Sequence, residues 1–204
     1  YGWWIPSTPA APTLILLHGW GRNLARTLPY IQALSPLGYN LLAFDARNHG
    51  SSSSVEHPTV GTFSQDVLSA VEFLQSNQRG MNGIGIVGLS VGGGAAINAA
   101  GWDERIRCVV TVGAISHPVA VLKYEFRKRH VPAFVASFLL AYMRRRYGLD
   151  FDAIAPLNNL PKSKADFLIV HGERDETIPL EQAQALLSAG SPDKTRLWIV
   201  PDKG

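Results

Sequence analysis

A serine of this chain stands in a pentapeptide whose spacing is typical of an enzyme nucleophile. Residues 88–92 read Gly-Leu-Ser-Val-Gly, so Ser90 lies between the apolar run Ile84–Val87 and a run of small residues that begins at Val91. A sharp turn from a strand into a helix leaves no room for side chains two positions before and after the serine, which explains both glycines. Such a turn lifts the hydroxyl clear of the sheet at a helix N-terminus, where developing negative charge is favoured.

A serine hydroxyl is a poor nucleophile at neutral pH and needs a base to take its proton. The chain has six histidines: His18, His49, His57, His117, His130 and His171. No pair of them has the H-E-x-x-H spacing of a zinc site, and the single cysteine cannot build a cysteine-based metal site. We therefore expect serine chemistry without a metal or cofactor.

Six apolar runs have the length and composition of buried strands, and helix-like segments separate most of them. The runs are Thr13–Leu17, Tyr39–Phe44, Ile84–Val87, Arg107–Val112, Phe167–Val170 and Arg196–Val200. Most are continuously hydrophobic rather than alternating, which is typical of parallel strands covered by helices on both faces. The sequence thus predicts one α/β domain over residues 1–204, a doubly wound and mostly parallel sheet.

Helical patterns lie between these strands. Asn23–Ser35 is predicted as a helix ended by Pro36 and Gly38, and Glu181–Ala189 as a shorter helix that follows Pro179. Thr62–Gln78 is predicted to open with a capping box in which Thr62 pairs with Gln65.

A long insertion interrupts the alternation at about residues 116–161. Its middle, Val131–Met143, is apolar but shorter than the roughly 17 to 25 residues that span a bilayer. Seven Lys or Arg residues and one acid lie between positions 123 and 147. We expect a helical lid that packs its apolar face on the body; the alternative is an interfacial helix that makes weak contact with a membrane surface.

The composition is that of an ordinary globular domain, with 46% hydrophobic and 17% charged residues. The formal net charge of +3 comes from the insertion, so the chain is not a basic protein overall and no nucleic-acid partner is indicated. Cys108 lies in an apolar run and is predicted to be buried. No signal peptide or transmembrane span is visible, and the localisation stays unknown.

Four blocks in order resemble the α/β-hydrolase superfamily, in particular its serine-aminopeptidase-like and esterase- or lipase-like members with a helical lid. They are the turn His18–Gly21, the loop Asp45–Ser51, the pentapeptide at Ser90 and the segment Phe167–Pro179. Together they span most of the chain. The long insertion falls where that family carries its lid.

The resemblance implies a role for individual residues. Ser90 aligns with the nucleophile, and the backbone N–H groups of Trp20 and Val91 align with the oxyanion hole. Asp175 aligns with the acid of the catalytic triad. Two competing acids fit less well, because Asp166 precedes its strand and Glu173 comes two residues too early for the family's pattern.

In this family the triad histidine follows the acid, whereas every histidine here precedes Asp175. His117 is the candidate for a substitute base. The family's histidine comes just after the last strand, so we expect it directly beyond Gly204. The opening residues 1–7 read like the end of a strand whose antiparallel partners are absent. These features predict a piece of a longer protein, with the fold incomplete at both ends and the 204-residue polypeptide inactive by itself.

The resemblance therefore implies a serine hydrolase that cleaves small carboxylic esters, less readily amides or peptides, through an acyl-enzyme on Ser90. Aromatic residues of the insertion favour a substrate with an apolar acyl group. The alternative is a non-catalytic binding or scaffold module of the same fold, which keeps a pocket but lacks a base.

Overall fold

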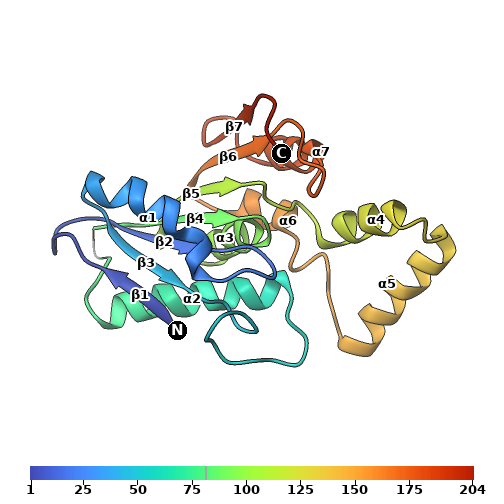
Figure 1. Ribbon diagram of the computed structural model, residues 1–204, viewed down its shortest axis with the longest axis horizontal. Helices are drawn as coiled ribbons and strands as arrows, with labels where there is room; N and C mark the ends of the chain where they lie inside the picture. The colour runs from blue at the N-terminus through green and yellow to red at the C-terminus, as the bar shows by residue number, and fades with distance from the viewer. Residues whose placement is uncertain (81) are drawn as a thin grey trace.

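Seven strands form one sheet in the computed structural model, which describes residues 1–80 and 82–204 (Figure 1). The spatial order is β1-β3-β2-β4-β5-β6-β7; β1 is antiparallel to β3 and the other neighbouring strands are parallel. The strands are β1 (Gly2–Ile5), β2 (Thr13–Leu17), β3 (Asn40–Phe44), β4 (Ile84–Leu89), β5 (Ile106–Val112), β6 (Asp166–Gly172) and β7 (Thr195–Val200). The predicted α/β fold with a mostly parallel sheet is confirmed.

The six predicted strands all occur, within one or two residues at each end. Continuous apolar runs were sufficient to find them because central parallel strands are buried on both sides. The opening residues also form a strand: Gly2 pairs with Phe44 and Ile5 with Leu41, so β1 is the antiparallel edge of the sheet.

The main core lies between one face of the sheet and the helices α2 (Val60–Ser76), α3 (Val91–Trp102) and α7 (Leu180–Ala189). The stripe Phe63, Val67, Val71 and Leu74 of α2 is fully buried in this core. The small residues of α3 let that helix approach β4 and β5 closely. This close approach matters for the site because α3 begins directly after Ser90.

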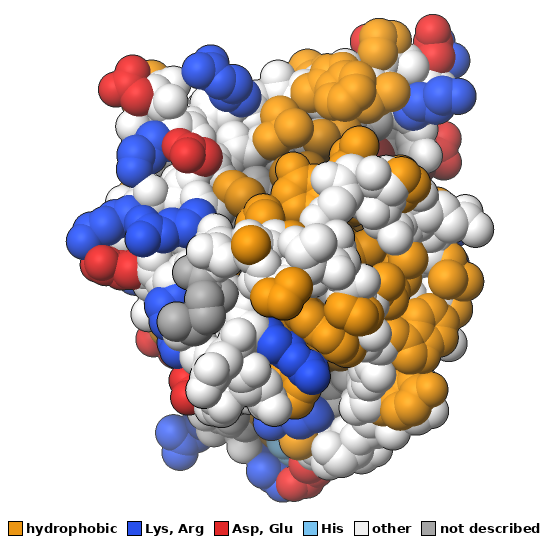
Figure 2. Space-filling view, turned by 90° about the vertical axis from the view of Figure 1, so that its left-hand side faces the viewer, with side chains coloured by type: hydrophobic (Ala, Val, Ile, Leu, Met, Phe, Trp, Pro, Cys, Tyr) orange, Lys and Arg blue, Asp and Glu red, His pale blue; other side chains and the backbone are white. Residues whose placement is uncertain are grey.

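The opposite face is covered less completely than the sequence indicated. The helix α1 (Leu28–Leu34) packs there over β2 and β3, against Leu16, Leu41 and Ala43. Over β5 to β7 the described helices leave side chains in the open, among them Trp198. Figure 2 shows hydrophobic side chains in the upper part of the molecule and down its right-hand side. The prediction that Cys108 is buried is therefore wrong, because its side chain is exposed. An apolar run does not indicate which of the two faces of a strand is covered by a helix.

The capping box predicted for α2 is also wrong. The helix starts at Val60, Thr59 is the N-cap, and its hydroxyl accepts a hydrogen bond from the Thr62 N–H at 3.3 Å. The hydroxyl of Thr62 returns the interaction by accepting from the Thr59 N–H at 2.7 Å. A threonine thus takes the place that glutamate or glutamine holds in the usual motif. Gln65 instead accepts a hydrogen bond from Arg47.

The helix predicted at Asn23–Ser35 divides into three pieces. A 3-10 turn over Leu24–Thr27 precedes α1, and another over Ser35–Leu37 follows it. Asn23 caps the first turn by accepting from the Ala25 N–H at 3.1 Å. Pro29 lies in the first turn of α1, where its missing N–H costs nothing, and a new helix therefore starts there.

The insertion at 116–161 is helical and has two parts. Its second part, α6 (Pro156–Asn159) and the 3-10 turn Leu160–Lys162, packs on α3, where Asn159 donates a buried hydrogen bond to Asn98 at 2.9 Å. Its first part, α4 (Pro118–Lys128) and α5 (Ala133–Tyr147), projects from the body as a helical pair (Figure 1). The role of a lid stays a prediction. Within the described residues no helix has the length and hydropathy needed to cross a membrane.

Candidate active site

Ser90 occupies the turn between β4 and α3 in a conformation that L-residues rarely adopt. Its φ is 53° and its ψ is −121°. The surrounding structure holds this strained backbone, because the Ser90 N–H donates to the Val112 carbonyl at 2.8 Å. The Ser90 carbonyl accepts from the Gly93 N–H at 2.9 Å, which begins α3. Strain of this kind costs about 1–3 kcal/mol and is concentrated at functional sites.

The two glycines around Ser90 are required by close backbone packing. A Cβ at position 88 would lie 2.5 Å from the Gly92 carbonyl oxygen. A Cβ at position 92 would overlap the His18 carbonyl oxygen, so only glycine lets the first turn of α3 lie against the end of β2. The sequence-based explanation of the pentapeptide is confirmed for these two positions.

His18 shapes the turn that follows β2. Its Nε2 accepts a hydrogen bond from the Ala46 N–H at 3.1 Å, so this nitrogen carries no proton. The proton is therefore on Nδ1, which donates to the Gly19 carbonyl at 2.8 Å. Burial lowers the pKa of His18 below its ordinary value of 6.5 and keeps the ring neutral. A ring bound in this way on both sides is a structural element and is not free to act as the base.

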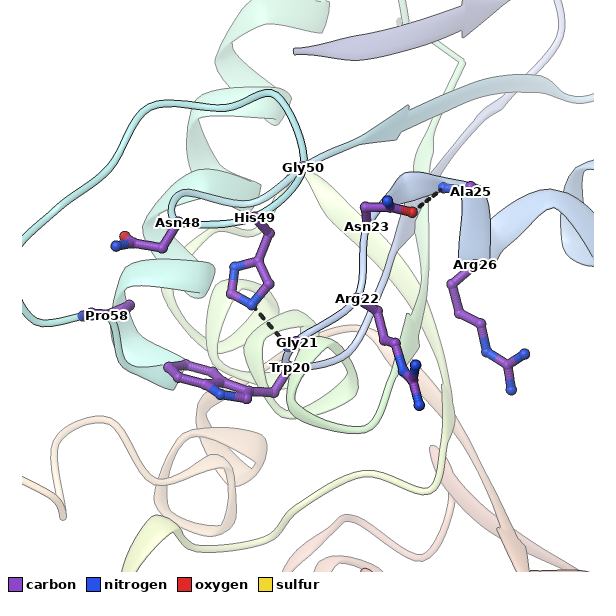
Figure 3. A pocket seen from close by; sticks show the side chains of 10 residues that line it. All are labelled: Trp20, Gly21, Arg22, Asn23, Ala25, Arg26, Asn48, His49, Gly50 and Pro58. Atoms are coloured by element: carbon purple, nitrogen blue, oxygen red, sulfur yellow. Dashed lines mark hydrogen bonds between the residues drawn. The ribbon is translucent and has the colours of Figure 1, made fainter.

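The loop after β3 holds the same turn from the other side (Figure 3). His49 Nε2 accepts from the Gly21 N–H at 3.0 Å. The buried carboxylate of Asp45 accepts from the Leu24 N–H at 2.7 Å and from the Ser51 N–H at 2.9 Å, and so ties the two loops together. The sequence analysis counted Asp45 only as part of a motif; a lone acid at the end of an apolar strand was the signal for its anchoring role.

Two backbone donors near Ser90 have no partner. In the part of the chain that the structure describes, neither the Trp20 N–H nor the Val91 N–H donates a hydrogen bond. Trp20 itself stacks on Phe63 with ring centroids 5.9 Å apart and meets His49 edge-on. Its ring contacts hold the turn in place, which leaves the N–H group available to a ligand.

Asp175 lies in the loop after β6, and its two carboxylate oxygens differ in their surroundings. Oδ1 accepts hydrogen bonds from the Thr177 N–H at 2.8 Å and the Ile178 N–H at 2.9 Å. Oδ2 accepts none from the described residues and faces Gly113 at the end of β5. One carboxylate oxygen therefore stabilises the loop, and the other is available to accept a hydrogen bond from another group.

The competing acids do not reach this position. Asp166 begins β6, at the opposite end of the strand from the Asp175 loop, and pairs with Cys108 of β5. Glu173 is turned outward and accepts from the Asp202 N–H at 3.1 Å. His117 is also occupied, because Nδ1 accepts from the Val119 N–H and Nε2 contacts Asp152 at 3.1 Å. None of these three residues lines the hollow that contains Ser90.

One hollow of about 610 Å³ brings the main candidates together. Ser90, Trp20 and Asp175 line it, together with Lys203 and Gly204 from the turn after β7. Val91 is not among the residues that line it, so the role of its N–H in an oxyanion hole stays a prediction. A second hollow of about 720 Å³ lies beside it and shares Trp20, with Arg22 and Arg26 between the two (Figure 3).

The turn after β7 is bound to the loop of Asp175. The Lys203 carbonyl accepts from the Arg174 N–H at 2.7 Å, and the Val200 carbonyl accepts from the Glu173 N–H at 3.0 Å. A Cβ at position 204 would lie 3.5 Å from the Asp175 Cα. Gly204 thus packs against the backbone of the loop that carries Asp175. No three His, Cys, Asp or Glu side chains of residues 1–80 and 82–204 are placed to hold one metal ion.

Several known proteins have sequences similar to this chain. A model described as "Alpha/beta hydrolase family" matches residues 14–204. Human "Protein ABHD12B" is 28% identical over 86% of this chain and 49% of its own length. The "Thiohydrolase aneE" of Aspergillus aculeatus is 30% identical over 63% of this chain and 40% of its own length. The chain thus spans about half the length of these two relatives.

Solved structures give the same fold. The Pyrococcus furiosus esterase Pf2001 superposes with a TM-score of 0.76 at 25% identity and covers 98% of this chain and 78% of its own. The Paleococcus ferrophilus monoacylglycerol lipase superposes with a TM-score of 0.75 at 19% identity and covers 100% and 89%. Because the family model matches residues 14–204, nearly the whole chain, the chain belongs to the alpha/beta hydrolase family.

Proposed function

We propose that the full-length protein is a serine hydrolase that cleaves carboxylic esters through an acyl-enzyme on Ser90. One observation carries the proposal: Ser90 sits in a strained turn at the start of α3 and shares a hollow with Asp175. Helix capping does not account for the strain, since the Ser90 side chain makes no capping hydrogen bond to α3.

The reaction we propose begins with attack of Ser90 Oγ on the ester carbonyl carbon. The carbonyl oxygen becomes negatively charged and accepts hydrogen bonds from the Trp20 and Val91 N–H groups, which have no partner among the described residues. The tetrahedral intermediate then expels the alcohol, and water attacks the acyl-enzyme to release the acid and regenerate the serine. Losing one such donor costs about 2.7–4 kcal/mol in related systems.

The proton of Ser90 needs a base, and we propose a histidine that follows Gly204 in the full-length protein. Support comes from the position of Gly204, which packs beside Asp175 and lines the same hollow as Ser90. Asp175 Oδ2 is available to accept a hydrogen bond from such a ring and to stabilise it once it is charged. The histidine would take the serine proton and deliver it to the leaving alcohol.

The substrate class follows from the walls of the hollow. Apolar side chains on several elements, namely Tyr30, Val112, Val170 and Ile178, line it together with Ser90. They suit an apolar acyl group. Esters are favoured over amides because the ester carbonyl is more electrophilic, since oxygen donates its lone pair to the carbonyl less than nitrogen does. Thioesters belong to the same test, since one relative is named a thiohydrolase.

The second hypothesis is a non-catalytic module that uses the hollow for binding. It predicts no covalent chemistry at Ser90 and a residue other than histidine directly after Gly204. Reading that residue in the full-length protein separates the two hypotheses at little effort.

The direct test is labelling of the full-length protein with a fluorophosphonate probe, followed by peptide mapping and by turnover of short p-nitrophenyl esters. We expect labelling at Ser90 and its loss in Ser90→Ala. Ser188, an exposed serine of α7, provides the control, and Ser188→Ala is expected to keep full labelling. Absence of labelling and of turnover in the folded full-length protein would favour the binding module.

A further inference from the structure

The helical pair α4–α5 contacts the body along α4 and at the end of α5. Figure 1 shows it projecting beyond the end of the sheet. The start of α4 follows β5, and the Tyr124 hydroxyl and the Lys128 Nζ both donate to the Glu176 carbonyl, at 3.0 and 3.1 Å. At the end of α5, the ring of Tyr147 lies 4.1 Å from that of His57. Between these points α5 packs on α4 and buries only Ala136 and Leu140.

The opposite side of α5 carries aromatic side chains that are half or more exposed to solvent. Phe134, Phe138 and Tyr142 are 77%, 69% and 50% exposed. Because they are spaced four residues apart, they lie on one side of the helix as a continuous stripe. The expectation that the insertion packs its apolar face on the body is therefore not met for α5. A single exposed apolar residue needs no explanation, but a continuous stripe marks an interaction surface.

Positive charge accompanies this stripe. Arg144, Arg145 and Arg146 end α5, and Arg127, Lys128 and Arg129 end α4. Arg129 and Arg144 are within reach of Glu125 and Asp152, but Arg127 and Arg145 have no acidic partner in the described part of the chain. Arg145 follows Tyr142 by three residues and Phe138 by seven, so it lies on the aromatic side of α5.

We propose that α4–α5 is a docking arm that binds the surface of an anionic lipid bilayer. Phe134, Phe138 and Tyr142 enter the interface between headgroups and acyl chains, and the arginines at the end of α5 contact the anionic headgroups. The helix lies along the surface: α5 has 15 residues, about 22 Å at 1.5 Å per residue, and the bilayer core alone is about 30 Å thick.

The charge selects this partner over a second copy of the chain. A parallel pair of arms joined through α5 would bring two Arg144–Arg146 clusters together. An antiparallel pair would set each cluster against the start of the other α5, whose first turn has no acidic residue. An anionic bilayer supplies both the apolar phase and the opposite charge. The arm also leaves the sheet at the end of β5, where Val112 and Gly113 line the hollow with Ser90, so docking brings that hollow to the lipid surface.

The test is flotation of the full-length protein with vesicles of phosphatidylcholine alone and with vesicles that also contain phosphatidylserine. We expect at least tenfold more bound protein on the anionic vesicles at low salt, and a loss of that excess at high salt, where the charges are screened. The variant Phe134→Ser, Phe138→Ser, Tyr142→Ser is expected to lose binding to both. Arg145→Gln with Arg146→Gln is expected to lose only the preference for the anionic vesicles.

Phe73 supplies the matched control, since it is a half-exposed phenylalanine on α2 away from the arm. Phe73→Ser should float like the unchanged protein. Circular dichroism and fluorophosphonate labelling show that each variant is folded, and neither readout depends on the membrane. Flotation that survives the triple substitution, or that is absent with both vesicles, overturns the proposal. So does a concentration-dependent dimer that the triple substitution abolishes, because the stripe would then bind a second copy.

Discussion

Replacing Ser90 with glycine and with alanine separates backbone strain from chemistry. Both changes remove the hydroxyl, so the difference in stability between the two variants reports the backbone. At a φ of 53° and ψ of −121° a residue with a Cβ is strained by about 1–3 kcal/mol, and glycine is not. Glycine loses about 0.5–1 kcal/mol more conformational entropy on folding. We therefore expect Ser90→Gly to unfold with a free energy about 1 kcal/mol higher than that of Ser90→Ala.

Urea denaturation of the two variants measures this difference, and thermal unfolding should show a shift of about 2–4 °C for a domain of this size. Ser69 provides the control, because it is exposed in the middle of α2. There alanine should be more stable than glycine by about 1 kcal/mol. If Ser90→Gly is no more stable than Ser90→Ala while Ser69 behaves as expected, the strain argument is refuted. The result does not depend on any catalytic activity.

Three further predictions concern the site. Gly92→Ala forces α3 away from β2 and should slow probe labelling about 100-fold, the effect of a displacement near 1 Å. Gly101→Ala at the far end of α3 is the control: its Cβ would lie 2.5 Å from the Asn159 carbonyl oxygen, so this variant should be less stable but keep its rate of labelling. Because burial depresses the pKa of His18 below 6.5, the unfolded chain binds its proton first as the pH falls. The contribution of neutral His18 to the free energy of unfolding is thus complete above about pH 6.5 and decreases below it. Urea midpoints measured at several pH values test this: they will show no such decrease if the folded protein protonates His18 as readily as the unfolded chain does. Asp175→Asn should slow labelling at Ser90 by about 10⁴-fold, as in other triads, whereas Glu173→Gln should leave it unchanged; equal effects would remove Asp175 from the proposed mechanism.

Strand positions were predictable because a central parallel strand is apolar on both sides, which is a local property of the sequence. The cap of α2 was placed wrongly because two threonine hydroxyls replace the usual glutamate or glutamine, and sequence rules weigh only common pairs. The burial of Cys108 was predicted wrongly because burial depends on which helix lies over a strand. That choice is made by contacts between residues far apart in the chain.

Sequence alone determined the turn at Ser90. Glycines two residues before and after a serine indicate a sharp turn in which side chains at these two positions would collide with the backbone. Tertiary structure decided the rest of the site. It brought Asp175 and Gly204 to the hollow that contains Ser90, and it used His18 and His49 to hold the turn at Trp20. It also left the aromatic side of α5 exposed, where the sequence predicted packing on the body. The physical reason is that hydrogen bonds and burial join distant segments, whereas backbone strain is a property of a few consecutive residues.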